Sequence, residues 1–198
     1  MLTLVGAGFF IMPDRVFIII DGNNFYHRLK ELNLKNLLNF DYEKFIQFLV
    51  GKRKLVLKKY YIGSIREEAN NPKSRELMIG QQKLLGKLQK QGWQFGFGHM
   101  LKTDEIYHEK GVDVLIAVDL LVGAYEDIFD TAILISSDTD LIPAIEKARE
   151  MKKKVEYIGF SHKPSYALIA NSDVRRLLIK DELLEYFKAI QRKNQKNH

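Results

Sequence analysis

The sequence contains no cysteine and only four proline residues among its 198 positions. Without cysteine, neither disulfide bonds nor thiolate zinc sites can form, so any bound metal ion must have oxygen or imidazole ligands. Only five histidines are present, and none has a serine partner at a recognisable spacing. The sequence therefore gives no support for a nucleophilic Ser-His or Cys-His hydrolase.

A hydrophobic run long enough to span a bilayer is also missing at the start of the chain. Residues 1–12 (MLTLVGAGFFIM) are apolar, but they are too short for a span and lack the basic segment of a secretory signal. We interpret them as a leader, or as sequence upstream of a true start at Met12. We expect one cytoplasmic domain over residues 13–191, no membrane association, and a polar tail over residues 192–198.

The overall composition is that of a globular protein, with 46% hydrophobic and 28% charged residues. The length fits one α/β domain with a sizeable core. Lys and Arg number 31 against 25 Asp and Glu, which gives a formal net charge of +6. This excess suits a polyanionic partner, although an ordinary solvated surface would also explain it.

Two kinds of apolar segment alternate along the chain. Short β-branched and aromatic runs predict buried strands at residues 16–20, 55–62, 93–100, 131–135 and 155–159. Amphipathic or capped segments predict helices after Asp41, at 75–91, 112–124 and 141–150, and short helical pieces at 166–170 and 182–190. The segment 112–124 is almost wholly apolar, so we expect a buried helix there. The alternation predicts an α/β fold with helices on both faces of a mostly parallel sheet.

Four aspartates from distant parts of the sequence are expected at one edge of this sheet. Asp21 ends the first strand, Asp138 and Asp140 follow the strand at 131–135, and Asp113 opens an apolar helix. In open α/β sheets, functional sites lie beyond the carboxyl ends of the strands, near the topological switch point. Taken singly, each aspartate could be a turn or cap residue. Together they would repel one another, and a hard cation such as Mg²⁺ or Mn²⁺ would compensate their charge.

Other polar residues near these aspartates could support them or contact a phosphate. This group comprises Asn23, Asn24, Lys110, Asp119, Ser136, Ser137 and Thr139. Asp119 lies about 9 Å along the helix axis from Asp113 and on a different face. We therefore expect a supporting or structural role for it. The remaining members could equally be turn, cap or solvated residues.

A phosphodiester backbone also needs positive charge beside the metal site. Candidate substrate-binding residues are Arg28, Arg66, Lys73, Arg75 and Lys102, with the loop from Ser64 to Ser74 expected along a substrate groove. Bases of single-stranded RNA could stack on Phe25, Tyr26 or Tyr107.

Three segments together carry a family resemblance. They are FIIIDGNNFY (residues 17–26), KGVDVLIAVDLL (110–121) and ILISSDTDLIPAIEKAREMKKKVEYIGF (133–160). With these segments the chain resembles the NYN domain family, within the LabA-like group of PIN-like nucleases. The resemblance implies a three-layer α/β/α fold, a metal site on Asp21, Asp113 and Asp138 with Asp140 assisting catalysis, and RNA as substrate. It also makes a homodimer plausible, because PIN-like nucleases often pair to form a groove.

The resulting hypothesis is a ribonuclease that depends on Mg²⁺ or Mn²⁺ and hydrolyses RNA through an aspartate cluster. The main alternative is a non-catalytic module that binds RNA or nucleotides and only retains the metal site. A haloacid-dehalogenase-like phosphatase is disfavoured because Asn23 stands where its second Asp is needed. A von Willebrand-type adhesion site is disfavoured because no serines follow Asp21 in DGNNF.

Overall fold

The computed structural model describes residues 13–64, 72–103 and 106–187, and the side chains of residues 73 and 99–109 are not described. The strands are β1 (Arg15–Asp21), β2 (Lys54–Gly63), β3 (Gln94–Thr103), β4 (Ile106–Lys110), β5 (Thr131–Ile135), β6 (Lys154–Phe160) and β7 (Val174–Leu178). The helices are α1 (Gly22–Glu31), α2 (Tyr42–Val50), α3 (Pro72–Lys90), α4 (Val112–Tyr125), α5 (Ile142–Glu150), α6 (Tyr166–Asn171) and α7 (Lys180–Leu184). Two short 3-10 helices, η1 (Leu37–Asn39) and η2 (Thr139–Leu141), complete the described elements.

The seven strands form one sheet in the order β4-β3-β2-β1-β5-β6-β7. The six strands from β3 to β7 in this order pair in parallel, and β4 pairs antiparallel with β3 at one edge. Along the chain, the strand order runs outward from β1 in one direction and then restarts at β5 on its other side. The topological switch point therefore lies between the carboxyl ends of β1 and β5, where a functional site is expected.

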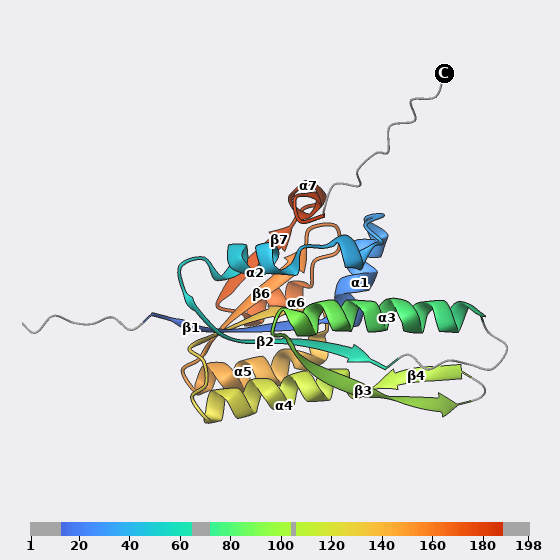
Figure 1. Ribbon diagram of the computed structural model, residues 1–198. Coiled ribbons are helices and arrows are strands. Elements are labelled where there is room, and N and C mark those ends of the chain that lie inside the picture. The colour runs from blue at the N-terminus through green and yellow to red at the C-terminus, as the bar shows by residue number, and fades with distance from the viewer. Residues whose placement is uncertain (1–12, 65–71, 104–105, 188–198) are drawn as a thin grey trace, which may run out of the picture.

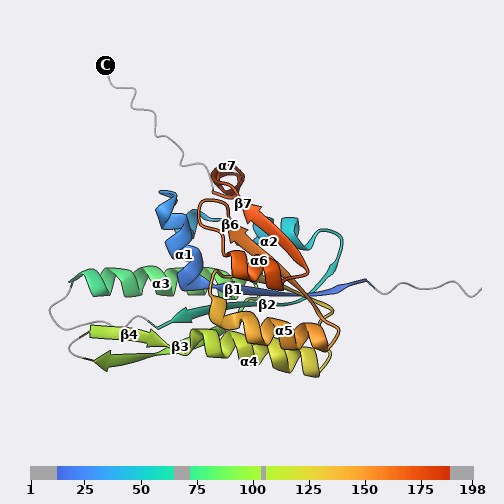
Figure 2. The ribbon, with the colours of Figure 1, turned by 180° about the vertical axis from the view of Figure 1, so that it is seen from behind.

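Helices cover both faces of the sheet, which gives the three-layer α/β/α fold that we predicted (Figures 1 and 2). Strand β1 shows why two layers are needed, because its side chains alternate between two separate apolar cores. Val16, Ile18 and Ile20 pack in the core under α1, α2, α3 and α7. Phe17 and Ile19 pack in the core under α4, α5 and α6.

The predicted segments agree with most of these elements, including the helix that Asp41 caps, but no helix was predicted where α1 follows Asp21. The side chain of Asp41 accepts a hydrogen bond from the Lys44 N–H at 3.1 Å, and Gly51 ends α2 with a φ of 61°. The helix expected at residues 75–91 begins earlier, at Pro72. Lys73 and Ser74 therefore belong to α3 and not to the loop predicted from Ser64 to Ser74, and Arg75 lies within the first turn of the helix. A proline in the first turn of a helix loses no hydrogen bond, which permits this early start.

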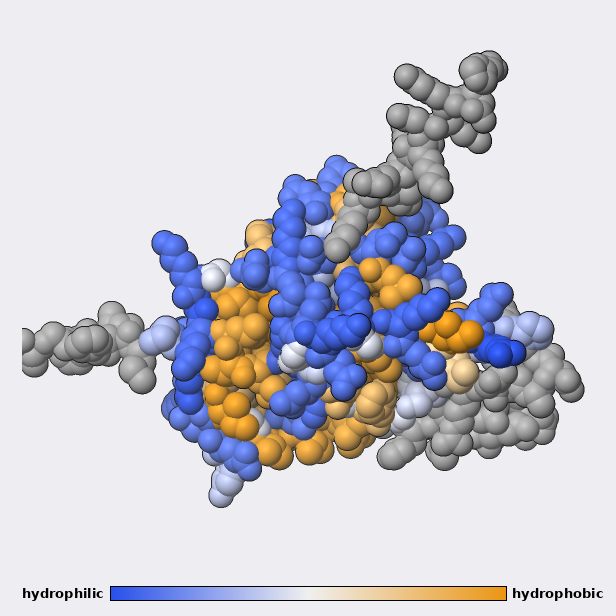
Figure 3. Space-filling view, viewed as in Figure 1, coloured by the Kyte–Doolittle hydropathy of each residue, from blue (hydrophilic) through white to orange (hydrophobic). Residues whose placement is uncertain are grey.

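The expectation of a wholly buried helix at 112–124 is wrong. Helix α4 packs Ile116 and Leu120 against the sheet, but Val114, Val118 and Val122 are exposed, as is Tyr125 at its end. Apolar surface is visible along the lower side of the molecule, where α4 lies in Figure 1 (Figure 3). The apolar composition of α4 therefore does not mean that all its faces are covered.

Candidate carboxylate site

Asp21 lies at the junction of β1 and α1, where the apolar strand gives way to the Gly-Asn-Asn turn. It caps α1, because its Oδ1 accepts a hydrogen bond from the Asn24 N–H at 3.0 Å. Its Oδ2 accepts a second hydrogen bond from the Ser136 hydroxyl at 2.9 Å. The side chain is only 5% exposed. Burial, and then repulsion by Asp113 and Asp138, raise the pKa of Asp21 to about 6 against the lowering effect of these two hydrogen bonds.

Asp138 follows β5, the strand beside β1, and is tied to the same serine. The Asp138 N–H donates a hydrogen bond to Ser136 Oγ at 3.1 Å. The Asp138 carboxylate in turn accepts from the Asp140 N–H at 2.9 Å, so Asp138 caps η2. Ser136 thereby connects the two aspartates across the switch point and fixes their relative positions.

Asp113 reaches this edge from the first turn of α4. The preceding Gly111 has a φ of 84°, a left-handed conformation that glycine adopts without strain. This turn lets the chain leave β4 and start α4 beside β1. Burial, and then the charges of Asp138 and Asp140, raise the pKa of Asp113 above its ordinary value. Asp113 is therefore in electrostatic contact with the aspartates that follow β5.

Asp21, Asp113 and Asp138 line one open pocket of about 370 Å³. The other lining residues are Asn23, Asn24, His27, Arg28, Gly111 and Val112. Three of the four predicted catalytic aspartates, from three distant segments, thus share one space. Asp140 does not line it, although its charge acts on Asp113.

The residues around this pocket fit a hard divalent cation. All three acidic groups offer oxygen ligands, and burial and mutual repulsion, which raise the pKa values of Asp21 and Asp113, disfavour their charged forms in the absence of a cation. Asn24 Oδ1 is also buried without a hydrogen-bond partner in the described part of the chain. Among the described residues, no three acidic or histidine side chains converge closely enough to enclose an ion. Mg²⁺ usually keeps several waters and is held by one or two carboxylates.

Asp119 lies away from this pocket, as its spacing from Asp113 predicted. Its Oδ2 accepts hydrogen bonds from Lys59 Nζ at 2.5 Å and from the Tyr61 hydroxyl at 2.8 Å. Both partners belong to β2. Asp119 thus joins α4 to the sheet, which is the structural alternative that we considered for it.

The remaining predicted residues fall into three groups: one that lines the pocket, some that lie elsewhere in the described structure, and some whose side chains are not described. Arg28 lines the pocket, forms an ion pair with Glu31 at 3.2 Å, and donates a hydrogen bond to Ser137 Oγ at 3.4 Å. Thr139 begins η2 and Lys110 ends β4, but neither lines the pocket. Arg75 lies in α3, whereas Arg66 and the side chains of Lys73 and Lys102 lie outside the described part.

The aromatic residues proposed for base stacking have different outcomes. Phe25 is fully buried in the core, so it cannot stack on a base. Tyr26 is partly buried, and the side chain of Tyr107 is not described. The burial of Phe25 follows from α1, whose inward face at every third or fourth position carries Phe25 and Leu29.

No helix in the described part of the chain has the length and apolar content that crossing a membrane requires.

Comparisons with known proteins identify both a family and a fold. The model of the NYN domain family matches residues 15–178. Among solved structures, one similar chain is a protein of unknown function from Vibrio parahaemolyticus, with a TM-score of 0.65 and 24% sequence identity. The match covers 86% of this chain and 96% of that one, and it supports the fold alone. No curated protein sequence gives a significant match.

Proposed function

Because the chain belongs to the NYN domain family, within the PIN-like nuclease superfamily, we propose that it is a metal-dependent ribonuclease that cleaves single-stranded RNA. The observation that carries this proposal is the pocket at the switch point, where Asp21, Asp113 and Asp138 meet from separate segments of the chain. These three carboxylates would hold Mg²⁺ or Mn²⁺, with Asp140 assisting from the rim. A divalent cation bound there lowers the pKa of a water and stabilises charge on phosphoryl oxygens.

The protein side chains then have defined tasks. Ser136 holds Asp21 in place, and its bond with the Asp138 N–H keeps the second carboxylate at the same site. Arg28 lines the pocket and can offset the charge of the phosphate, and His27 lines the same pocket. Asn23 and Asn24 provide amide groups on the same wall.

The proposed reaction is hydrolysis with in-line displacement at phosphorus. The water oxygen forms a bond to phosphorus, the bond from phosphorus to O3′ breaks, and the 3′-oxygen leaves with a proton. The products carry a 5′-phosphate and a 3′-hydroxyl. Products that end in a 2′,3′-cyclic phosphate would contradict this chemistry.

Cleavage of a labelled single-stranded RNA tests the proposal directly. Wild type, Asp21→Asn and the control Asp127→Asn are each incubated with Mg²⁺, Mn²⁺ or EDTA. Asp127 lies at the amino end of the parallel strands, beside Arg15 and Lys153. We expect cleavage by wild type and Asp127→Asn, at least a ~100-fold loss in Asp21→Asn, and none in EDTA.

The same assay separates the nuclease from the regulatory alternative. If none of the three proteins cleaves RNA with either metal while all bind it, the non-catalytic module replaces the nuclease proposal. Equal cleavage by Asp21→Asn and wild type would instead remove the aspartate pocket from the reaction.

Two further expectations about the whole protein stay predictions. A homodimer would be detected by analytical ultracentrifugation of the purified chain, and a cytoplasmic location by fractionation of the cells that produce it.

A further inference from the structure

A second cavity lies next to the carboxylate pocket and is not used by the proposed reaction. It has a volume of about 280 Å³ and lies among α1, η1, β2 and α3. Its deepest side chains, Tyr60, Ile62 and Leu84, are buried. Leu38 and Leu77 are exposed at 37% and 48%, so apolar surface continues to the solvent side. Such a volume is at the small end of ligand pockets, which hold about 300–1,000 Å³.

The first turn of α1 forms a common wall between the two pockets. Gly22 lines the second cavity, and Asn23 lines both. The wall is therefore a single helical turn, about 5 Å along its axis, that starts directly after Asp21. A group bound in the second cavity would lie beside a phosphate held at the carboxylates.

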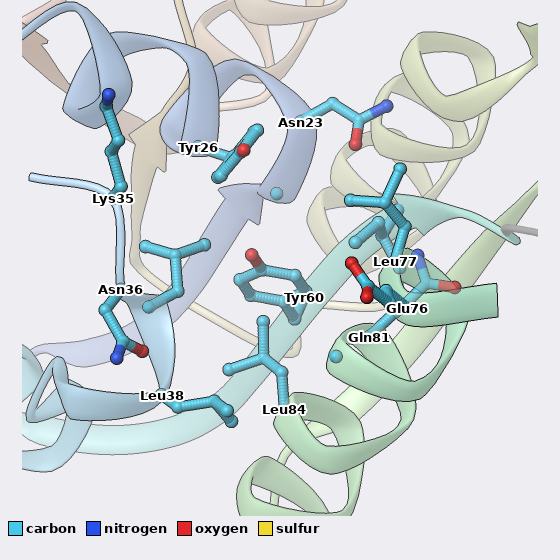
Figure 4. Close-up of a pocket in the computed structure, with 14 residues that line it drawn as sticks. Asn23, Tyr26, Lys35, Asn36, Leu38, Tyr60, Glu76, Leu77, Gln81 and Leu84 are labelled. Atoms are coloured by element: carbon cyan, nitrogen blue, oxygen red, sulfur yellow. The ribbon is translucent and has the colours of Figure 1, made fainter. Parts of the chain in front are cut away.

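The walls and polar groups of the cavity have the chemistry of a base-binding site. Figure 4 shows Tyr26 and Tyr60 bordering the same space, with Asn23 and Glu76 to one side and Asn36 to the other. The Tyr60 hydroxyl is buried and forms no hydrogen bond of normal geometry with any described residue. The Tyr42 hydroxyl lies next to it, close enough to affect the pKa of Tyr60.

We infer that this cavity binds the base of the nucleotide next to the scissile phosphate of a single-stranded RNA; the inference rests on the function proposed above. A nucleobase has two apolar faces that match the aromatic and aliphatic walls, and a polar edge that can meet the amide and carboxylate groups. A phosphate is a poorer match than a base, because the wall is largely apolar and its two charged residues, Lys35 and Glu76, have opposite signs.

Glu76 gives this site a preference among bases. An ionised carboxylate accepts hydrogen bonds and donates none. Bases with an exocyclic amino group (adenine, guanine or cytosine) can donate to it. Uracil presents carbonyl oxygens on both sides of its single N–H, so it is disfavoured. Glu76→Gln, which can also donate, reduces the preference.

Helix α3 offers a variant that fills the cavity without disturbing the protein. Gly80 lines the cavity, has a helical conformation, and has no atom within 4 Å of an added Cβ. Leucine at this position would project into the free space, and it is a better helix former than glycine. Gly86 is a matched control in the same helix, because its added Cβ also meets nothing within 4 Å and it does not line this cavity.

The test measures binding of a fluorescent single-stranded RNA octamer by anisotropy, with Ca²⁺ in place of Mg²⁺. The proteins are wild type, Gly80→Leu, Gly86→Leu and Glu76→Gln, and one set of octamers carries an abasic nucleotide at successive positions. We expect Gly80→Leu to weaken binding about tenfold and Gly86→Leu to leave it unchanged. One abasic position should weaken binding to wild type by a similar factor and should have little further effect on Gly80→Leu.

The outcomes separate this inference from the nuclease proposal. Equal affinities of wild type, Gly80→Leu and Gly86→Leu, or wild-type binding too weak to measure, would overturn the base pocket. Equal effects of the abasic nucleotide on wild type and Gly80→Leu would also overturn it and would point to an aliphatic occupant. If the base effects appear but wild type cleaves no RNA with Mg²⁺ or Mn²⁺, the base pocket stands and the nuclease proposal fails.

Discussion

At the scale of single residues, Gly22 connects the carboxylate site with the neighbouring cavity. It follows Asp21 in the chain, and the Tyr60 ring lies against its backbone. A Cβ at this position would come within 2.3 Å of Tyr60 Cε1 and 2.8 Å of Tyr60 Oη. Tyr60 is fully buried and cannot move aside cheaply. The absence of a side chain at residue 22 is therefore a steric requirement of the turn that places Asp21.

Gly22→Ala should consequently damage both the stability of the protein and the position of Asp21. We expect the free energy of unfolding to fall by about 1–3 kcal/mol, because overpacked cores relax by shifting backbone and side chains. RNA cleavage should fall more steeply than the folded fraction. Urea unfolding and cleavage assays measure the two effects, with Gly86→Ala as a control that adds the same methyl group to open space outside the second cavity. Equal stability of both variants would show that Tyr60 does not constrain this turn.

The carboxylate positions could be predicted from the sequence, whereas the Gly22 contact could not. Asp21 and Asp138 follow strongly apolar strands, and the rule for open parallel sheets then places both at one edge. The contact of Gly22 with Tyr60 depends on strand pairing between β1 and β2, which place Ile20 beside Tyr60. No local pattern near residue 22 contains that information. The second cavity is equally invisible, because its walls come from α1, η1, β2 and α3.

At the scale of elements, α4 presents two aspartates with different surroundings. Asp113 in its first turn lines the carboxylate pocket, and Asp119 pairs with Lys59 and Tyr61 of β2. The first is repelled by neighbouring acids, while the second is neutralised by a lysine. One helix therefore carries a carboxylate suited to cation binding and another that fastens the helix to the sheet.

Replacing each aspartate by asparagine should separate these roles. Asp113→Asn should lower RNA cleavage by about a hundredfold without loss of stability in EDTA, because it removes a repelled charge. Asp119→Asn should cost about 1–2 kcal/mol of unfolding free energy, because Lys59 and Tyr61 lose their charged acceptor. The cleavage rate of Asp119→Asn should stay close to that of wild type. Thermal unfolding and initial cleavage rates of both variants provide the comparison, and a reversed pattern would exchange the assigned roles.

Three longer elements were not predicted from the sequence, namely helix α1 and the two edge strands β4 and β7. Strand β7 (VRRLL) is exposed at its first three residues, and β4 (IYHEK) is short and polar. Edge strands lack a neighbour on one side and need not be apolar on both faces, so they give no buried-strand pattern. The prediction for α4 was wrong in the opposite direction, because its valines are apolar but exposed. Their apolar character predicted burial, but only one face of this helix meets the sheet.

At the scale of the whole molecule, the two ends of the parallel strands have opposite electrostatic character. The carboxyl end gathers acidic groups, and burial, followed by repulsion between them, raises the pKa values of Asp21 and Asp113. The amino end is stabilised by ion pairs, in which Arg15 contacts Asp130 at 2.7 Å and Asp127 at 3.0 Å. The hydrogen bonds from Arg15 lower the pKa of Asp130 to about 2. Acidic groups at the amino ends of the strands therefore have basic partners, whereas those at the carboxyl ends repel one another.

This separation predicts how stability depends on pH in EDTA. In the folded protein the pKa of Asp21 is about 6, above the ordinary aspartate value of 3.8. Protonation therefore favours folding, and this contribution is full below about pH 4 and lost as the pH rises through about 6, up to roughly 3 kcal/mol. The pKa of Asp130 is lowered to about 2. Its contribution is full above about pH 4 and is lost as the pH falls toward 2.

Stability in EDTA should therefore be greatest near about pH 4–5, and each arm of the curve should respond to one variant. Asp21→Asn should flatten the decline between about pH 4 and pH 7, because the titrating carboxyl is gone. Asp130→Asn should lower stability at about pH 7 and reduce the loss below about pH 4. Adding Mg²⁺ at about pH 7 should stabilise wild type more than Asp21→Asn, because an ion that binds the native state shifts the equilibrium toward it. Urea unfolding across this pH range measures all three effects. Parallel curves for wild type and Asp21→Asn would mean that Asp21 is not a destabilising charge at the carboxyl edge.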